Sequence, residues 1–423
     1  MLWGTGTVAL IFGTGIYFTV KLKFFQFRRL GFIFKSTLFA GASENHTAKG
    51  ENVSRFQALS TALAASMGTG NIIGVASAVS IGGAGAVFWM WASALFGMAT
   101  AYAENVLGVK YKDKAAPGPM AYLEYGLRCK PFAVVFAAAC VLASFGIGNM
   151  TQTNAISSAG LQFGISPYVS GAAIVIFAGF IILRGSKSIA KATEKIIPAV
   201  SFFYMIGAVL VLFIFRENIG RVLVEIVTSA FGLKAAVGGA AGYAVKQAVT
   251  VGLRRGIFSN EAGMGSSVLV HTATGCNDPA VMGMWAVAEV FIDTIVCCTL
   301  TALVILSTGA QFDGGEGVAV VVAAFEYGLG GFARYFISIS AVIFAFATLL
   351  GWCWYGARSL SYLTAGKTAN AAYKLLFLSA AYIGAVADVT LIWEISDTLN
   401  IFMLLPNIVA LIILRKEALA IGN

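Results

Sequence analysis

The chain contains many stretches of about 17 or more residues that carry little or no charge, which is the usual length of a membrane-spanning helix. A helix rises about 1.5 Å per residue, so each stretch can cross the roughly 30 Å hydrocarbon layer of a bilayer. Of 423 residues, 59% are hydrophobic and only 11% are charged. Ordinary soluble domains have roughly 25% charged residues. The chain is therefore predicted to be an integral membrane protein.

Eleven of these stretches are predicted to be transmembrane helices. A helix satisfies its own backbone hydrogen bonds in lipid, whereas an open sheet does not. The short alternating segments typical of membrane β-barrels are absent from the sequence. The predicted spans cover residues 4–20, 56–81, 85–109, 131–161, 167–183, 195–215, 243–272, 279–309, 332–357, 371–388 and 391–414. The predicted fold class is an all-α membrane protein with a single transmembrane domain over residues 1–423.

The basic residues lie mostly in the short segments between the spans. If the N-terminus lies outside, the inner loops hold 21 Lys and Arg residues and the outer loops hold four. Basic residues concentrate on the cytoplasmic side of membrane proteins. The chain is thus predicted to lie in the cell membrane with its N-terminus outside and its C-terminus in the cytoplasm. The same placement accounts for the net charge of +9 without a nucleic-acid partner.

Ten of the spans form two sets of five, over residues 56–215 and 243–414, after a peripheral first helix at 4–20. Spans that correspond at a nearly constant offset are 85–109 with 279–309, 131–161 with 332–357, and 167–183 with 371–388. Because each set has an odd number of helices, the second set inserts upside down relative to the first. Inverted repeats of this kind are typical of secondary transporters.

The leading helix of each half contains a glycine-rich polar run at mid-span, and Met67 aligns with Met264 at a similar offset. The first run contains Gly68, Thr69, Gly70 and Asn71, and the second contains Ser259, Asn260, Glu261 and Gly263. Glycine is a poor helix former, so both helices are predicted to unwind there. Freed N–H groups can then hold a carboxylate, and freed carbonyls can hold a cation. Close helix packing is the alternative use of such glycines.

Longer motifs include Gly68–Ala76, Gly82–Trp91, Arg255–Ser266 and Leu350–Gly356. They resemble the alanine or glycine:cation symporter family over essentially the whole chain. The resemblance implies a leucine-transporter-type fold of five-plus-five inverted helices with one extra N-terminal helix. It also implies cotransport of Na⁺, or in some members H⁺, with alanine, glycine or a similarly small amino acid, and no cofactor. One departure is Gly82-Gly-Ala-Gly85, where many members have Gly-Gly-Pro-Gly.

The resemblance also implies roles for individual residues. The backbone from Gly68 to Gly70 would meet the substrate carboxylate, and Asn71 would lie near the substrate or the ion. Sodium would be held by backbone carbonyls and one hydroxyl, from Ala64, Met67, Ala345 and Thr348. The alternative for Thr348 is a hydrogen bond to its own helix, which is common for Thr in membranes.

Further candidates come from buried polar groups in the spans. Gln152 is expected to bind substrate, because a buried amide is costly without a partner; it would share a helix face with Asn149. The role of Asn154 stays open. Trp352 is either core or the wall of a small pocket, since it lies one turn beyond Thr348.

Acidic residues within spans indicate function. Glu261 would bind the substrate ammonium, hold a cation or carry a proton, and an ion pair with Arg254 or Arg255 is the structural alternative. Asp293 is expected to act in a polar network or a gate rather than as a ligand.

The hypothesis is a Na⁺-coupled symporter of a small amino acid, with a proton-coupled transporter as the alternative. A passive channel is a less favoured class, because broken paired helices are typical of transporters. An enzyme is disfavoured because the two histidines stand apart from any metal or nucleophile cluster. The phosphate-binding loop of ATP-driven pumps is absent from the sequence as well.

Overall fold

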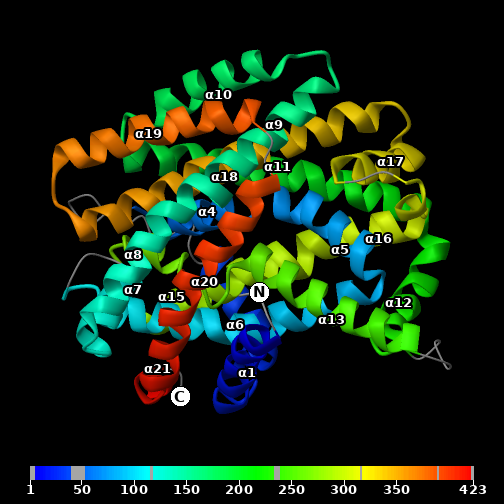
Figure 1. Ribbon diagram of the computed structural model, residues 1–423. Helices are drawn as coiled ribbons and strands as arrows, with labels where there is room; N and C mark the ends of the chain where they lie inside the picture. The colour runs from blue at the N-terminus through cyan, green and yellow to red at the C-terminus, as the bar shows by residue number, and fades with distance from the viewer. Residues whose placement is uncertain are drawn as a thin grey trace.

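The computed structural model describes residues 5–39, 53–114, 118–232, 239–314, 317–387 and 390–420, and the named elements there are all helical (Figure 1). The α-helices are α1 (Thr5–Lys21), α2 (Phe25–Arg28), α3 (Leu30–Phe34), α4 (Arg55–Ser66), α5 (Val75–Gly82), α6 (Gly85–Tyr111), α7 (Pro119–Ala121), α8 (Lys130–Phe145), α9 (Thr151–Leu161), α10 (Pro167–Ile182), α11 (Ser186–Ile214), α12 (Arg216–Ala230), α13 (Gly239–Asn260), α14 (Val268–His271), α15 (Pro279–Val290), α16 (Thr299–Thr308), α17 (Val318–Leu329), α18 (Phe332–Leu363), α19 (Lys367–Val386), α20 (Thr390–Ile413) and α21 (Arg415–Ala420). Wider π-helical turns are η1 (Lys35–Phe39), η2 (Gly70–Gly74), η3 (Tyr122–Gly126), η4 (Gly146–Met150) and η5 (Phe291–Cys298), and η6 (Ala310–Phe312) is a 3₁₀ turn.

The chain is an all-helical, multi-pass membrane protein. Six helical segments of the described chain are long and apolar enough to span a bilayer, and a bent pair formed by α4 and the segment 70–82 makes a seventh. Most of each of the eleven predicted ranges is helical; residues 4 and 388 lie outside the described part, and the ranges 56–81 and 243–272 each contain a non-helical break. The remaining ranges are shorter apolar helices (α1, α10 and the apolar part of α20) or, for 243–272, an interrupted helix. Helix length and composition alone therefore identify fewer than eleven membrane-spanning helices in the described part of the chain.

One predicted boundary was wrong, and one helix was not predicted. The range 195–215 begins at Ser186 in α11, so Lys187 and Lys191 lie on a helix rather than in a loop. A helix can continue past the hydrocarbon because long basic side chains reach into water from its surface. The apolar helix α17 was not predicted, since its 12 residues are too few to span a bilayer.

Two helices that position the site, α4 and α15, begin at defined caps. The Ser54 hydroxyl accepts a hydrogen bond from the Gln57 N–H at 3.0 Å, and the Gln57 side chain accepts one from the Ser54 N–H. This reciprocal pair is a capping box and starts α4. At α15, the Asp278 carboxylate accepts from the N–H groups of Ala280 and Val281, with Pro279 in the first turn. Pro favours this position because its missing N–H would have no helical partner.

Corresponding helices of the two halves lie side by side. α6 packs on α15, α10 packs on α19, and α18 packs on both α8 and α9. Figure 1 shows α18 in the upper half of the view, with α17 at the upper right and α12 at the lower right. Small residues bring these helices close, because a side chain at Gly283 would meet the ring of Tyr102 and one at Gly351 would meet Ala65. The packing leaves the interrupted middles of the leading helices in the interior.

Candidate functional site

The first break separates α4 from η2. Helix α4 ends at Ser66, and the next helical segment begins at Gly70 at an angle of 51°. In a continuous helix the Gly68 N–H would bond to the Ala64 carbonyl; here it donates to the Ser66 carbonyl at 2.9 Å. The backbone at this level is therefore turned out of the helical ladder. Residues 66–71 are all buried, so the turned-out groups face the protein interior.

The second break follows Asn260. Glu261 has φ 53°, and Gly263 and Gly265 have φ 93° and 73°. Positive φ is uncommon for a non-glycine residue such as Glu. Three residues with positive φ within five positions prevent a regular helix. The chain becomes helical again only at Val268. Both leading helices are thus interrupted where the glycine-rich runs predicted.

The two breaks meet at the carboxylate of Asp293 in η5. One carboxylate oxygen accepts a hydrogen bond from the Asn71 amide at 2.8 Å, and the other accepts from the Ser259 hydroxyl at 2.8 Å and from Thr294 at 2.7 Å. The Cys298 thiol lies 3.4 Å from the Asn71 amide nitrogen and 3.3 Å from the Ser259 hydroxyl. Asp293 therefore joins the first half of the chain to the second in the buried centre of the protein.

This cluster is rich in oxygen and carries a formal negative charge. The carbonyl oxygen of the Asn71 side chain is buried without a hydrogen-bond partner. Such a buried orphan oxygen is unusual, and a cation can satisfy it. In the described part of the chain, no three His, Cys, Asp or Glu side chains cluster as transition-metal ligands. The arrangement suits a hard cation that binds oxygen.

Gln152 and Thr348 close around the first break. The Thr69 N–H points to the side-chain oxygen of Gln152 at 3.4 Å. A side chain at Gly68 would collide with the Thr348 hydroxyl and would come within 3.2 Å of the Gln152 oxygen. The Thr348 hydroxyl also donates to the Phe344 carbonyl at 3.1 Å, which is the helix-bonded alternative. The structure thus brings Gly68, Gln152 and Thr348 together.

Ala64, Met67 and Ala345 are also buried. Ala345 lies one turn before Thr348 on α18, and Gly351, one turn after it, packs directly on Ala65. Residues three apart share a helix face. This face of α18 is therefore the one that lies against the end of α4.

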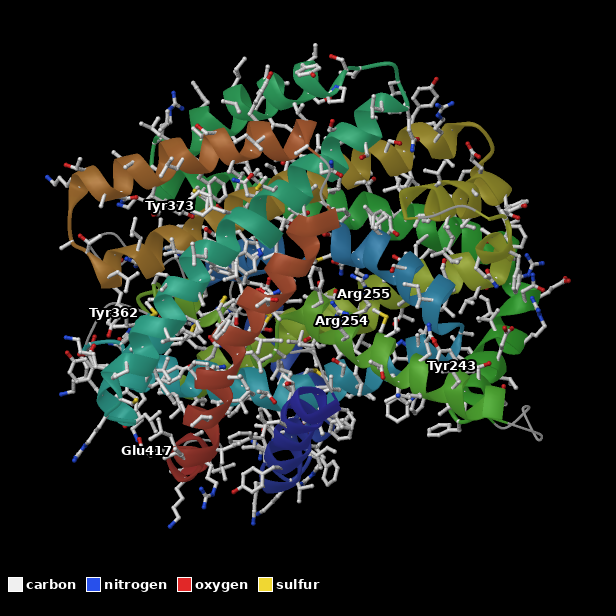
Figure 2. All side chains as sticks on the ribbon, in the orientation of Figure 1. Tyr243, Arg254, Arg255, Tyr362, Tyr373 and Glu417 are labelled. Atoms are coloured by element: carbon white, nitrogen blue, oxygen red, sulfur yellow. The ribbon has the colours of Figure 1, made fainter. Side chains whose placement is uncertain are left out.

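Glu261 and Trp352 lie near the second break. The Ser266 hydroxyl donates to the Glu261 carboxylate at 2.5 Å, and the Trp352 indole is also close to this carboxylate. Trp352 packs on Gly148 so closely that any side chain at position 148 would overlap its ring. Arg255 donates to the Ser77 hydroxyl on α5 at 3.2 Å, and Figure 2 shows Arg254 and Arg255 on α13.

Some predicted residues turn away from the first break. The Gly263 carbonyl accepts from the Asn407 side chain on α20 at 2.8 Å, and the Asn260 side chain accepts from the Ala262 N–H at 3.1 Å. Asn407 in turn bonds Glu104 on α6 and accepts from the Tyr122 hydroxyl. Gly263 therefore belongs to a neighbouring network that holds the second break against α6 and α20, whereas the Asn260 side chain bonds within the break itself.

The expectation that Asn149 and Gln152 share a face was wrong. The Asn149 amide donates to the Phe377 carbonyl on α19 at 2.6 Å, whereas Gln152 reaches the first break. Asn149 lies in the η4 turn, which is wider than an α-helical turn and ends at Met150, whereas Gln152 lies in α9, so the α-helical spacing rule does not hold between them. Asn154 donates to the Ala387 carbonyl at 3.1 Å and bridges helices.

Sequence reasoning missed the central position of Asp293. The available signal was an acidic residue inside an apolar span. Its partners Asn71 and Ser259 are separated from it by 222 and 34 positions, so their convergence required the fold.

Comparisons with known proteins identify relatives of this chain in sequence and in fold. The sodium/alanine symporter AgcS of Methanococcus maripaludis is 40% identical over 432 aligned positions, covering 98% of this chain and 92% of AgcS. The probable sodium/glutamine symporter GlnT of Bacillus subtilis is 36% identical, covering 98% of this chain and 87% of GlnT. Among solved structures, MhsT in complex with L-phenylalanine has a similar fold, with a TM-score of 0.60 at 15% identity, covering 89% of this chain and 93% of MhsT.

The match to a protein family extends over residues 1–423, so it includes both broken helices and the helices that pack on them. The chain belongs to the sodium:alanine symporter family.

Proposed function

We propose that this chain carries a small amino acid, alanine or glycine, into the cell together with Na⁺. The observation that carries the proposal is the pair of buried helix breaks joined through Asp293. Unwound backbone of this kind offers N–H groups to a carboxylate and carbonyls to a cation. Trp352, packed on Gly148, would form the wall of a pocket that admits only a small side chain.

The proposed architecture is eleven spans, with residues 56–215 and 243–414 as inverted repeats after the peripheral helix 4–20. The side-by-side packing of corresponding helices supports it, as does the break in the leading helix of each half. The excess of basic residues in the inner loops supports an outside N-terminus and a cytoplasmic C-terminus. Because the breaks are buried, substrate entry requires one group of helices to move against the other.

Two oxygen clusters would serve the ion. The first is the carbonyls of Ala64, Met67 and Ala345 with the Thr348 hydroxyl. The second is the Asp293 carboxylate with the Asn71 side-chain oxygen. The amino acid would bind between them, at the Gly68–Gly70 backbone, Gln152, Ser259 and Glu261. Ion and substrate share the same broken helix, so each raises the affinity for the other by the same factor.

Uptake of labelled alanine into proteoliposomes is the direct test. With an inward Na⁺ gradient, the internal alanine concentration is expected to rise several-fold above the external one, and choline in place of Na⁺ is expected to abolish the accumulation. Equal uptake in choline, driven instead by an inward proton gradient, would contradict sodium coupling and favour Glu261 as a proton carrier. Flux that never exceeds equilibrium would indicate a channel.

Replacing Thr348 by Val removes the hydroxyl but keeps the shape of the side chain. The half-saturating Na⁺ concentration for uptake is expected to rise roughly 10- to 100-fold, because a bond to a charged group contributes about 1.5–3 kcal/mol. Thr348→Ser, which keeps the hydroxyl, is the matched control and should stay near wild type. If Val and Ser variants have the same Na⁺ midpoint, the hydroxyl bonds only to its own helix.

A further inference from the structure

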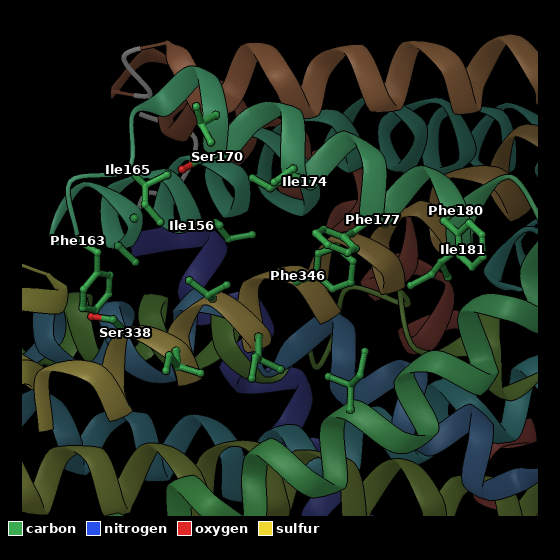
Figure 3. Close-up of a pocket in the computed structure, with 18 residues that line it drawn as sticks. Ile156, Phe163, Ile165, Ser170, Ile174, Phe177, Phe180, Ile181, Ser338 and Phe346 are labelled. Carbon is green, nitrogen blue, oxygen red and sulfur yellow. The ribbon is translucent and has the colours of Figure 1, made fainter. Parts of the chain in front are cut away.

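A long apolar hollow lies between α10, α11 and α18, away from the two breaks. One part encloses about 740 Å³ and a second about 730 Å³, and both are lined by Ile196, Ile339 and Ile343, so they form one continuous groove. Figure 3 shows Ile174 and Phe177 of α10 and Phe346 of α18 among the side chains that line the hollow. Each part falls within the roughly 300–1,000 Å³ of ordinary ligand pockets.

At one end of the groove, basic side chains replace the apolar lining. A third hollow of about 490 Å³ shares Phe180 and Ile181 with the apolar groove and is lined by the basic residues Arg184, Lys191 and Lys195. The Arg184 guanidinium lies 3.7 Å from the centre of the Phe180 ring. All three basic side chains are exposed. A positively charged entrance thus opens directly into a hydrocarbon-like groove.

The one acid in this lining does not cancel the positive charge. The Glu194 carboxylate accepts a hydrogen bond from the Gln57 side chain at 2.9 Å. It contributes one negative charge against three positive ones in the same lining. The hollow therefore retains a net positive charge, which favours an anionic ligand.

We infer that this groove binds an anionic phospholipid, with its phosphate at Arg184, Lys191 and Lys195 and an acyl chain along α10 and α18. Basic pockets between membrane helices on the cytoplasmic side suit such headgroups. The apolar lining follows α10 from Val169 to Ile181, which is about 18 Å at 1.5 Å per residue. That length is close to half of the roughly 30 Å hydrocarbon layer, as one leaflet's acyl chain requires. Only the assignment to the cytoplasmic leaflet rests on the proposed topology.

The headgroup contact is tested by native mass spectrometry of the purified chain with phosphatidylglycerol and with phosphatidylcholine. The triple variant Arg184→Gln/Lys191→Gln/Lys195→Gln is expected to lower phosphatidylglycerol affinity on the order of 100-fold, because each basic residue contributes about 1 kcal/mol at a membrane surface. Phosphatidylcholine binding should change little. The control Lys21→Gln/Lys130→Gln/Lys367→Gln removes three exposed basic residues elsewhere and should keep wild-type affinity.

The acyl-chain contact is tested separately with Ile174→Trp/Ile343→Trp, which fills the groove without altering its charge. This variant is expected to bind phosphatidylglycerol at least 10-fold less tightly, whereas excess glycerol phosphate should compete only weakly with the lipid on wild type. Full competition by glycerol phosphate would indicate a soluble phosphate site and overturn the lipid assignment. Equal losses in the two charge variants would overturn it too, as would a disulfide-linked dimer formed by a Phe177→Cys variant in nanodiscs. None of these readouts depends on transport, so they stand apart from the proposed symport.

Discussion

Replacing Asp293 by Asn is expected to reduce Na⁺-driven alanine uptake to a few per cent of wild type at moderate Na⁺ concentrations. Asn has the same shape, and the hydroxyls of Ser259 and Thr294 can accept as well as donate, so packing and local hydrogen bonding survive. The formal negative charge is lost. Removing one partner of a buried charge pair costs about 3–5 kcal/mol, which corresponds to a rise of roughly 100-fold or more in the half-saturating Na⁺ concentration.

The measurement is initial uptake as a function of Na⁺ concentration, together with the thermal stabilisation that Na⁺ gives the purified protein. Glu289→Gln is the matched control. It removes another buried carboxylate one turn earlier, whose hydrogen bond goes to His271 at 2.9 Å instead of to either break. If both variants shift the Na⁺ midpoint equally, the effect is one of overall buried charge, and Asp293 is not a ligand.

The second large effect is expected from Gly68→Ala. The added methyl group overlaps the Thr348 hydroxyl and approaches Gln152, and neither can retreat easily because both are buried. Overpacking of this kind costs about 1–3 kcal/mol, and here it falls on the contact that shapes the site. Alanine uptake is expected to fall by at least 10-fold, with a lower melting temperature.

Gly74→Ala serves as the control, because a methyl group at position 74 meets only the Thr69 carbonyl at 3.9 Å. That variant should keep both uptake and stability. The double variant Gly68→Ala/Thr348→Ala removes the overlapping hydroxyl and should recover the melting temperature, while the Na⁺ midpoint stays raised as in Thr348→Val. Full recovery of Na⁺ affinity in the double variant would contradict the role proposed for the Thr348 hydroxyl.

The sequence predicted the places where the helices break, because glycines and polar residues at mid-span have a local cause and a local effect. It also predicted that Gln152 would be buried near a functional element. The contacts of Asn149 could not be predicted from the sequence, since a π-helical turn shifts the face on which a side chain lies. Similarly, α17 was missed because its 12 residues are apolar but too few to span a bilayer.

Charged and polar partners from distant segments were the least predictable part. Asp293 could be recognised as an unusual residue, but its bonds to Asn71 and Ser259 depend on three helices meeting at one depth. Gly263 illustrates the reverse case. It lies in the predicted run, yet its carbonyl bonds to Asn407, because the left-handed backbone at this position turns toward α20.

A single carboxylate tethers two helices that belong to opposite halves of the chain. The Asn71 amide and the Ser259 hydroxyl each bond to Asp293 at 2.8 Å, and a hydrogen bond weakens steeply beyond about 3.2 Å. Any rocking that parts the halves at this depth by more than a few tenths of an ångström must release one tether. In the proposed transport cycle, a pivot at this level would keep both hydrogen bonds intact, with the large displacements confined to the two ends of the helices.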